Sequence, residues 1–153
     1  MVLSTIQIFK MIIVLFGQPH SGKTTLAREL MYTMHAYHID GDNLRDLFKN
    51  KDYSKEGRIK NLNRASDIAH YVNDGIGADV ILSLVYPYKE TRDYLNSLTD
   101  DVKWVYLTYT NPRGREKFHV SDFEEPELEN FLQINTDNLT VEQCLNQIKS
   151  YVE

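Results

Sequence analysis

The sequence predicts a three-layer α/β fold in which helices cover both faces of a mainly parallel sheet of about five strands. Short apolar runs rich in β-branched residues, of which residues 11–16 are the clearest, are typical of parallel strands buried on both faces. Between these runs lie segments whose apolar residues recur at spacings of three and four, as on the buried side of a helix. The two kinds of segment alternate along the chain, and this alternation favours a parallel sheet flanked by helices.

The first half of the chain supplies three of the expected helices. Residues 21–35 are predicted to be helical because apolar residues recur there at every fourth position. A short helix with one apolar side is expected at 43–48. The longest helix is expected at 54–73, where Ser54 can cap the first turn and two glycines soon after residue 73 end it.

The other elements follow the same two patterns. The remaining strands are short apolar runs, and Thr140 is expected to cap the last helix. These elements are strands at 37–39, 79–85, 103–109 and, as a fifth candidate, 131–135, together with helices at 88–98 and 140–151.

The composition indicates one cytoplasmic domain that spans residues 1–153. A formal net charge of -5 argues against nucleic acid or an anionic membrane as partner, because the non-specific attraction would have the wrong sign. No apolar run approaches the ~20 residues that a membrane span needs. The single cysteine, Cys144, is expected to be buried in the last helix, and the absence of a second one fits a reducing compartment. Met11 is an alternative start, in which case residues 1–10 are an added extension.

The stretch GQPHSGKTT, which follows the first strand, fits the phosphate-loop pattern G-x-x-x-x-G-K-[ST]. Its glycines let the backbone amides converge on one point, and the helix that follows adds its positive N-terminal end. Lys23 is expected to reach the β- and γ-phosphates of ATP, and Thr24 to offer its hydroxyl to Mg²⁺. The predicted nucleotide-binding residues of this loop are Gly17, His20, Ser21, Gly22, Lys23, Thr24 and Thr25.

Two carboxylates, Asp40 and Asp42, flank a glycine at the end of the second strand. A kinase needs a carboxylate that orients the acceptor hydroxyl and takes its proton, and parallel strands bring this segment to the edge that carries the phosphate loop. The alternative is an aspartate-rich turn that only caps the short helix after it.

The chain resembles the adenylylsulfate kinase (APS kinase) family, whose members use ATP to phosphorylate the 3′-hydroxyl of adenosine 5′-phosphosulfate (APS). The resemblance covers most of residues 11–152 and is interrupted once. It is carried by the segments GQPHSGKTTLA, IDGDNLRDLF, DYSKEGRIKNLNRASDIAHYVNDGIGADVIL, YPYKETRDY and FEEPELENFLQINTDNLTVEQCLNQI.

The resemblance implies roles for residues at matching positions. Lys23 is a catalytic residue, Asp40 is the general base, and Asp42 lies beside it on the metal or the acceptor. Arg45, Arg58 and Asn61 hold the APS nucleotide, and Tyr53 and Phe118 enclose its adenine. Two alternatives remain open: Arg58 and Asn61 form only a solvated helix face, and the two aromatic rings are ordinary hydrophobic cover. Because family members commonly pair, a homodimer also stays open.

Three departures from the family concern the acceptor and the lid. Tyr86 stands where the family has a serine, so its ring is expected to alter or close part of the acceptor pocket. His20 replaces a small residue and either faces solvent or touches the γ-phosphate. The lysine-rich lid is cut to TNPRGREKF, in which Arg113, Arg115 and Lys117 are expected to supply a reduced charge clamp, with Arg113 toward the nucleotide and Lys117 toward the acceptor. The alternative for this segment is an exposed basic loop without a catalytic part.

The shortened lid leaves the acceptor open. The leading interpretation is an ATP- and Mg²⁺-dependent kinase that acts on APS. The second is a phosphate-loop kinase for another small nucleotide-linked or sugar-like alcohol. A nucleotide-binding regulator without activity is a third, although Lys23, Thr24 and Asp40 are all present. A polynucleotide kinase is disfavoured by the acidic charge.

Overall fold

The chain folds around a five-stranded sheet in which every pair of neighbours is parallel. A computed structural model describes residues 10–153, so the expected extension at 1–10 lies outside the described residues except for Lys10. The strand order is β2-β3-β1-β4-β5, which confirms the predicted parallel sheet. The strands are β1 (Ile12–Phe16), β2 (Tyr37–Asp40), β3 (Val80–Ser83), β4 (Val102–Thr108) and β5 (Phe131–Asn135).

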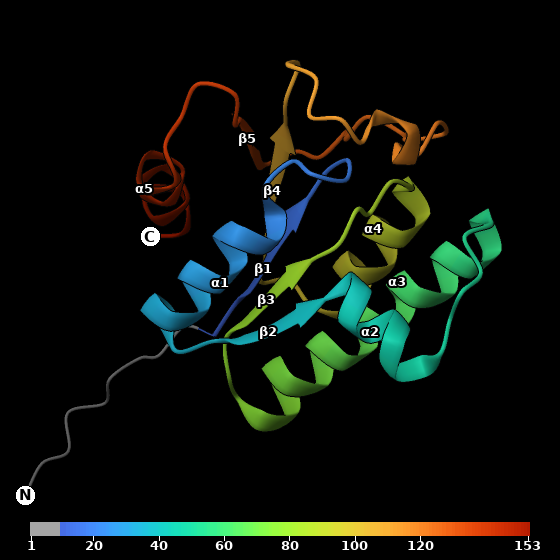
Figure 1. Cartoon of the computed structure of the whole chain (residues 1–153). Coiled ribbons are helices and arrows are strands. Elements are labelled where there is room, and N and C mark those ends of the chain that lie inside the picture. Colours follow the sequence, from blue (N-terminus) through green and yellow to red (C-terminus); the bar gives the residue numbers. More distant parts are fainter. Residues whose placement is uncertain (1–9) are drawn as a thin grey trace, which may run out of the picture.

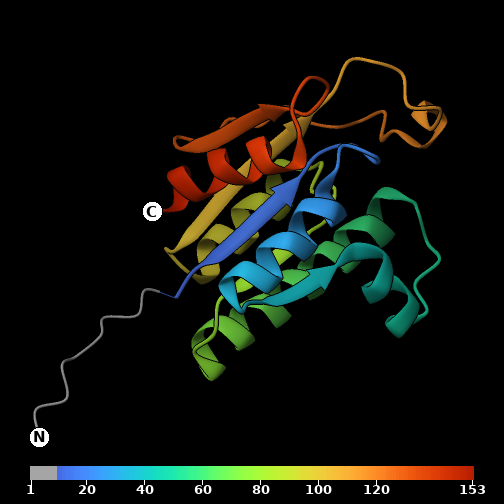
Figure 2. The same ribbon diagram turned by 60° about the vertical axis from the view of Figure 1, so that its left-hand side comes forward.

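Helices cover both faces of this sheet, as predicted. Figure 1 and Figure 2 show α1 and α5 on one side and α3 and α4 on the other, while α2 follows directly on β2. The α-helices are α1 (Lys23–Met34), α2 (Gly41–Phe48), α3 (Lys55–His70), α4 (Lys89–Leu98) and α5 (Val141–Val152). No helix in the described part of the chain is both long and apolar enough to cross a membrane.

The central strand β1 has all five of its residues buried, because both of its faces are covered. Val14 and Phe16 pack into the cluster on the side of α3 and α4, whereas Ile13 and Leu15 pack into the cluster on the side of α1 and α5. Cys144 lies buried in this second cluster, as expected. The continuous apolar run therefore predicts the right strand for the right physical reason.

Two elements differ from expectation by more than one residue at their C-terminal ends. The long helix is α-helical only as far as His70 and continues as a π-helical turn, η1 (Tyr71–Ile76), before Gly77 ends it with a φ of 81°. The third strand ends at Ser83, two residues before the apolar run ends. The chain then leaves the sheet, and Tyr86 adopts a φ of 43° in this connection.

The topology determines where a ligand can lie. The sheet neighbours of β1 are β3 and β4, and the chain reaches them on opposite sides of β1. Such a switch point opens a crevice beyond the carboxyl end of the strand. The loop after β1 faces the ends of β2 and β3, and the segment between β4 and β5 lies above it in Figure 1.

Candidate active site

The loop between β1 and α1 is held in one conformation by close packing. Gly17 has a φ of 144°, and a Cβ atom added to it would lie 2.2 Å from the carbonyl oxygen of Leu107 on β4. Only glycine fits at this position, because both the backbone angle and the space exclude a side chain. Gly22, at the other end of the loop, has a φ of 104° and precedes α1.

Five consecutive carbonyl oxygens of the loop, from residue 17 to residue 21, each accept a hydrogen bond from a side chain. The carbonyls of Gly17 and Gln18 accept from Lys23 Nζ at 3.0 and 2.9 Å. The next three carbonyls accept from side chains that follow β4 and β5. These pairs are Pro19 O with Tyr109 Oη (2.7 Å), His20 O with a guanidinium nitrogen of Arg113 (2.7 Å), and Ser21 O with Thr136 Oγ1 (3.0 Å).

The amides of the loop are left free by this arrangement. Within residues 10–153, the N–H groups of His20, Gly22, Lys23 and Thr24 donate to no protein atom. Free amides at the start of α1, together with the positive end of the helix dipole, form an anion site. Lys23 lies in the same place, and burial lowers the pKa of its ammonium to about 8, against the opposing effect of Asp40 and Asp42.

Asp40 connects the loop to the neighbouring strands. Its Oδ1 accepts hydrogen bonds from Thr24 Oγ1 at 3.1 Å and from Ser83 Oγ at 2.8 Å. Its Oδ2 accepts from the backbone amides of Asp42 and Asn43 at 3.2 and 3.4 Å, and so caps α2. The two interpretations of this segment are therefore compatible, because one carboxylate caps the helix and also faces the phosphate loop.

One cavity of about 960 Å³ connects these groups with the segment between β4 and β5. It spans the loop after β1, the carboxylates at the end of β2 and the start of α2, the start of α3, and the residues of and next to η2 (Glu116–Phe118). Of the predicted site residues, those that line the cavity are His20, Gly22, Lys23, Thr24, Thr25, Asp40, Asp42, Arg45, Tyr53, Arg58, Asn61, Lys117 and Phe118. Those that do not line it are Gly17, Ser21, Tyr86 and Arg113.

The far end of the cavity carries cations and aromatic rings. Arg45 stacks over the Tyr53 ring, 4.1 Å from its centroid, and one of its guanidinium nitrogens also donates to the carbonyl of Asp52 at 3.0 Å. Arg58 forms no ion pair within the described residues. Asn61 is buried, and its Oδ1 has no hydrogen-bond partner in the part of the chain that the structure describes. A ligand that donates a hydrogen bond would satisfy this buried oxygen, whose desolvation is otherwise uncompensated.

Tyr86 corrects the expectation that its ring alters the acceptor pocket. The side chain is fully buried in the cluster beneath α3 and α4, where its ring packs edge-on against Trp104 at 5.4 Å. Its hydroxyl forms a hydrogen bond of 3.0 Å with Ser66 Oγ, and burial raises the pKa of the phenol. The left-handed backbone at this residue turns the ring into the core, so it does not reach the cavity.

The buried Arg92 links two segments next to the cavity. Its guanidinium donates to the carbonyls of Tyr86 and Glu124 at 2.8 and 2.9 Å. Burial lowers the pKa of this guanidinium. These two bonds join the connection after β3 to the acidic end of the segment between β4 and β5.

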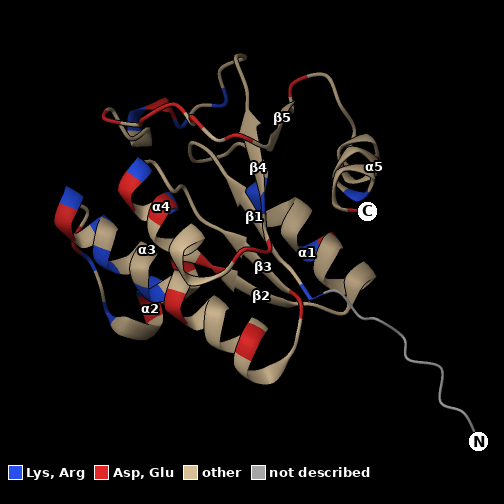
Figure 3. Cartoon of the chain, turned by 180° about the vertical axis from the view of Figure 1, so that it is seen from behind, with Lys and Arg blue, Asp and Glu red and all other residues tan. Residues whose placement is uncertain are grey.

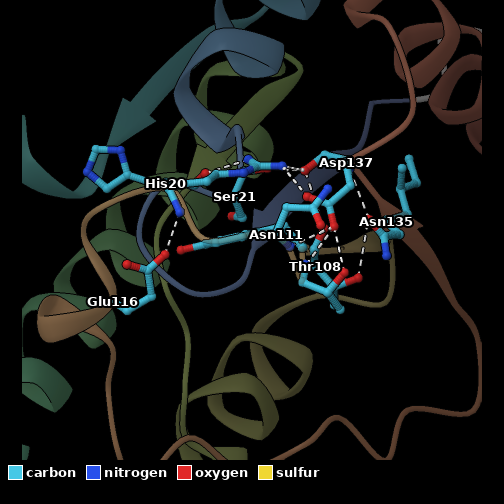
Figure 4. A network of polar contacts seen from close by, with 12 residues as sticks. His20, Ser21, Thr108, Asn111, Glu116, Asn135 and Asp137 are labelled. Atoms are coloured by element: carbon cyan, nitrogen blue, oxygen red, sulfur yellow. Dashed lines mark hydrogen bonds and ion pairs between the residues drawn. The ribbon is translucent and has the colours of Figure 1, made fainter.

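Arg113 lies beside the phosphate loop without lining the cavity, which corrects its expected place in the clamp. Its guanidinium donates to the His20 carbonyl, to Thr136 Oγ1 at 2.9 Å and to Asp137 Oδ1 at 3.2 Å. Figure 4 shows His20, Ser21 and Asp137 meeting in this network. Hydrogen bonds, chiefly from the amide and hydroxyl of Thr110, hold the pKa of Asp137 at about 2. Arg113 therefore joins the phosphate loop to the residues after β5, outside the cavity.

The segment between β4 and β5 is basic at first and acidic afterwards, as the blue and red stretches in Figure 3 show. Its basic part reaches the cavity through Arg115 and Lys117. The shortened lid thus brings positive side chains to the site, although only these two of its three expected cations line the cavity. The charged residues in chain order are Arg113, Arg115, Glu116, Lys117, Asp122, Glu124, Glu125, Glu127 and Glu129.

Several residues of the site were missed from the sequence. Ser83 and His119 line the cavity, and Gln18 and Asp137 hold its loops. The position of Ser83 could have been predicted from the alignment of the parallel strands, because Ser83 lies opposite Asp40. The role of Gln18 could not have been predicted from local sequence, because its partner is 102 residues away.

The sequence of the chain is similar to those of one protein family. The sequence profile of the family described as adenylylsulphate kinase matches residues 10–115. The adenylyl-sulfate kinase of Oceanobacillus iheyensis is 28% identical over an alignment of 163 positions, gaps included, which covers 90% of this chain and 81% of that protein. The adenylyl-sulfate kinase of Staphylococcus epidermidis is 29% identical over an alignment of 167 positions, with the same two coverages of 90% and 81%.

Solved structures with a similar fold include an APS kinase and a gluconokinase. The APS kinase CysC of Mycobacterium tuberculosis, solved in complex with AMPPNP and APS, superposes with a TM-score of 0.81 at 20% identity and covers 94% of this chain and 97% of its own. A gluconokinase from Sinorhizobium meliloti superposes with a TM-score of 0.71 at 14% identity, covering 95% and 93%. At these identities the two likenesses concern the fold.

Proposed function

Because the chain belongs to the adenylylsulfate kinase family, we propose that it transfers the γ-phosphoryl group of ATP to the 3′-hydroxyl of APS. The observation that carries this proposal is the contact of 3.1 Å between Thr24 of the phosphate loop and Asp40, within one cavity. Donor and acceptor groups thereby come together at the carboxyl edge of the sheet. Catalysis in such a site consists mainly of positioning and charge stabilisation.

The donor side is formed by the loop after β1. Its free amides and Lys23 would hold the β- and γ-phosphates. Lys23 now donates to carbonyls of its own loop, so its ammonium must turn toward the phosphates when ATP binds. The residues proposed for the nucleotide are those predicted in the loop, and Gly17 and Ser21 contribute backbone geometry, since neither lines the cavity.

A magnesium ion fits the residues beside this loop. The Thr24 hydroxyl donates its hydrogen to Asp40, so the lone pairs of its oxygen remain available to a cation. Oxygen ligands suit Mg²⁺, which usually takes only one or two protein ligands and completes its shell with phosphate and water. Thr24 would hold the ion, whose chemical contribution is to neutralise charge on the transferring phosphoryl group.

The acceptor side is proposed at the far end of the cavity. Arg45, Arg58 and Lys117 would balance the negative charge of the phosphosulfate, and Tyr53 and Phe118 offer exposed rings to an adenine. Stacking of a base on such a ring contributes about 1–3 kcal/mol in other nucleotide binders. Asp42 lies exposed beside the carboxylate of Asp40, which would take the proton of the acceptor hydroxyl.

The decisive experiment offers ATP–Mg²⁺ and APS to the purified chain, with ADP release and the phosphorylated product both measured. We expect turnover with APS, none with Lys23→Ala, and a loss of about 10²–10⁴-fold in kcat with Asp40→Asn at similar ATP affinity. Equal losses of kcat and ATP affinity in Asp40→Asn would make Asp40 a binding residue. The absence of any heat with ATP–Mg²⁺ in calorimetry would refute the phosphate-loop assignment.

The short lid favours a second candidate, in which the acceptor is another small nucleotide-linked or sugar-like alcohol. The family profile matches only as far as residue 115, within the lid. A panel of nucleotides and sugars with the same ADP readout separates the two candidates. Turnover of one of these alcohols without turnover of APS would establish the second.

We further propose that residues 1–153 act as one cytoplasmic domain on small molecules and form a homodimer. The lone buried thiol of Cys144 supports a reducing compartment. One APS kinase of similar fold, from Thiobacillus denitrificans, is described as hexameric, which supports self-association within the family. Light scattering of the purified chain measures its mass directly, and a monomeric mass at all concentrations would refute the dimer.

A further inference from the structure

A chain of hydrogen bonds runs from Asp40 to a histidine that does not line the cavity. Ser83 Oγ lies 2.8 Å from Asp40 Oδ1, and His38 Nε2 lies 2.7 Å from the same Ser83 oxygen. The parallel register explains this geometry. Ser83 lies opposite Asp40, while His38 lies two residues before Asp40 and so shares its face of β2. These three side chains therefore converge on the face of the sheet that α1 covers.

The direction of these hydrogen bonds follows from the donors available. An ionised carboxylate only accepts, so the single hydroxyl hydrogen of Ser83 must point to Asp40. The Ser83 oxygen can then only accept from His38, which requires the hydrogen of the imidazole to sit on Nε2. Because Nε2 carries a hydrogen in the cation as well as in this neutral tautomer, the chain persists in both protonation states.

The surroundings of His38 agree with this assignment. Burial lowers the pKa of its imidazole, Asp40 on the same strand raises it, and Arg28 on α1 lowers it. The charged groups that influence His38 are thus Asp40 on β2 and Arg28 on α1, and Ser83 on β3 contacts its ring. The imidazole is neutral at neutral pH, and a neutral ring has one N–H, which the Ser83 contact locates on Nε2.

We propose that His38 and Ser83 are positioning residues that orient the Asp40 carboxylate for proton transfer from the acceptor hydroxyl. The inference rests on the proposed kinase function. Thr24 and Ser83 approach the same oxygen of Asp40 from α1 and from β3, so together they hold the plane of the carboxylate. Without Ser83 the carboxylate keeps Thr24 on Oδ1 and two backbone amides on Oδ2, so its plane is less restricted and the fraction of molecules with a correctly directed base falls.

The alternative is that His38 and Ser83 are only a polar cross-strand pair that stabilises the sheet. Measurements of unfolding and of steady-state kinetics distinguish a role in stability from a role in orienting the base. A structural pair would lower the free energy of unfolding and leave kcat unchanged at temperatures where the chain is folded. An orienting pair lowers kcat and leaves KM for ATP and for the acceptor nearly unchanged, because the base acts only in the transition state.

The test compares four variants by steady-state ADP release, with thermal unfolding measured for each. We expect Ser83→Ala and His38→Leu each to lose about tenfold in kcat with KM values within about twofold. His38→Gln places an amide N–H near the former Nε2 and should recover most of that loss. Tyr37→Leu, on the opposite and exposed face of β2, is the matched control and should keep the parental kcat.

The double variant S83A/H38L adds a sharper criterion. Because both residues act through one chain, its kcat should equal that of Ser83→Ala alone. The proposal is overturned if His38→Leu keeps the parental kcat, if His38→Gln loses as much as His38→Leu, or if the two losses multiply.

A spectroscopic measurement keeps this result separate from the proposed function. Nitrogen-15 NMR of the imidazole should find the hydrogen of His38 on Nε2 in the parent, with this preference weakened in Ser83→Ala. A hydrogen on Nδ1 would refute the chain of hydrogen bonds whatever the acceptor is. Absence of transfer to APS in the parent, with the hydrogen on Nε2, would instead refute the proposed acceptor, and the kinetic comparison then moves to the alcohol that is turned over.

Discussion

The side-chain amide of Gln18 pairs with the backbone of Val120 through two hydrogen bonds, across a sequence separation of 102 residues. Its Nε2 donates to the Val120 carbonyl at 3.0 Å, and its Oε1 accepts from the Val120 amide at 2.8 Å. Gln18 belongs to the phosphate loop, whereas Val120 follows the short lid and lines the cavity. The position of the lid is therefore joined to that of the loop.

Gln18→Leu should loosen this connection, because leucine has a similar volume and no hydrogen-bonding group. We expect the amide of Val120 to exchange with solvent about tenfold faster, since each lost bond contributes about 1 kcal/mol. We also expect KM for ATP to rise, because the phosphate loop loses the same two hydrogen bonds. Hydrogen exchange followed by mass spectrometry measures the first effect, and Gln133→Leu on the exposed part of β5 is the control. Unchanged exchange at Val120 would show that the pair does not restrain the lid.

Asp137 should make stability depend on pH in acid. Its pKa lies at about 2 in the folded chain, against 3.8 as the ordinary value. Its contribution is therefore complete above about pH 4 and is lost as the pH falls toward 2, because the unfolded chain takes up the proton first. Urea denaturation at pH 5, 3 and 2 should find that the advantage of the parent over Asp137→Asn shrinks with falling pH. A constant difference across this range would contradict the assignment.

His20→Gly should stabilise the chain, because His20 has a left-handed φ of 67°. This conformation destabilises the folded chain by about 1–2 kcal/mol when the residue has a Cβ atom. Glycine removes this strain, but it also gives the unfolded chain more conformational freedom, which offsets part of the gain. We expect a gain of about 0.5–1 kcal/mol in the free energy of unfolding. His35→Gly is the matched control, since His35 has a φ of 54° at the end of α1. If the His20 ring touches the γ-phosphate, His20→Gly will raise KM for ATP, whereas His35→Gly will leave it unchanged.

Tyr86→Phe should destabilise the fold and leave the acceptor site intact. The change removes the partner of the buried Ser66 hydroxyl, which costs about 1–2 kcal/mol. Because the ring lies outside the cavity, KM for the acceptor should stay the same. Thermal unfolding and steady-state kinetics measure the two effects, with the exposed Tyr71→Phe as control. A raised KM for the acceptor at unchanged thermal stability would instead show that Tyr86 contacts the acceptor.

Much of the site followed from local patterns. The phosphate-loop motif is read over a few residues, and parallel strands must bring Asp40 to the same edge of the sheet. The contact between Thr24 and Asp40 needed only these two facts. Neighbouring residues therefore predict the geometry of this part of the cavity.

Long-range contacts account for what the sequence could not reveal. Arg113 was expected at the nucleotide, but its partner Asp137 lies 24 residues further along and binds it behind the loop. Tyr86 was expected at the acceptor, but a backbone turn after Ser83 directs its ring into the core. Neither the side-chain type nor the apolar spacing reports such a turn, because it depends on where the strand ends.

The hydrogen bonds that the carbonyls of Pro19, His20 and Ser21 accept from residues after β4 and β5 have a thermodynamic consequence. The backbone freedom of the loop is already lost when the chain folds, so an incoming nucleotide does not have to order it. Preorganisation of this kind transfers part of the binding penalty to the folding reaction. Tyr109 and Thr136, which bond to carbonyls of the loop without lining the cavity, therefore influence nucleotide affinity by lowering the entropic cost of binding.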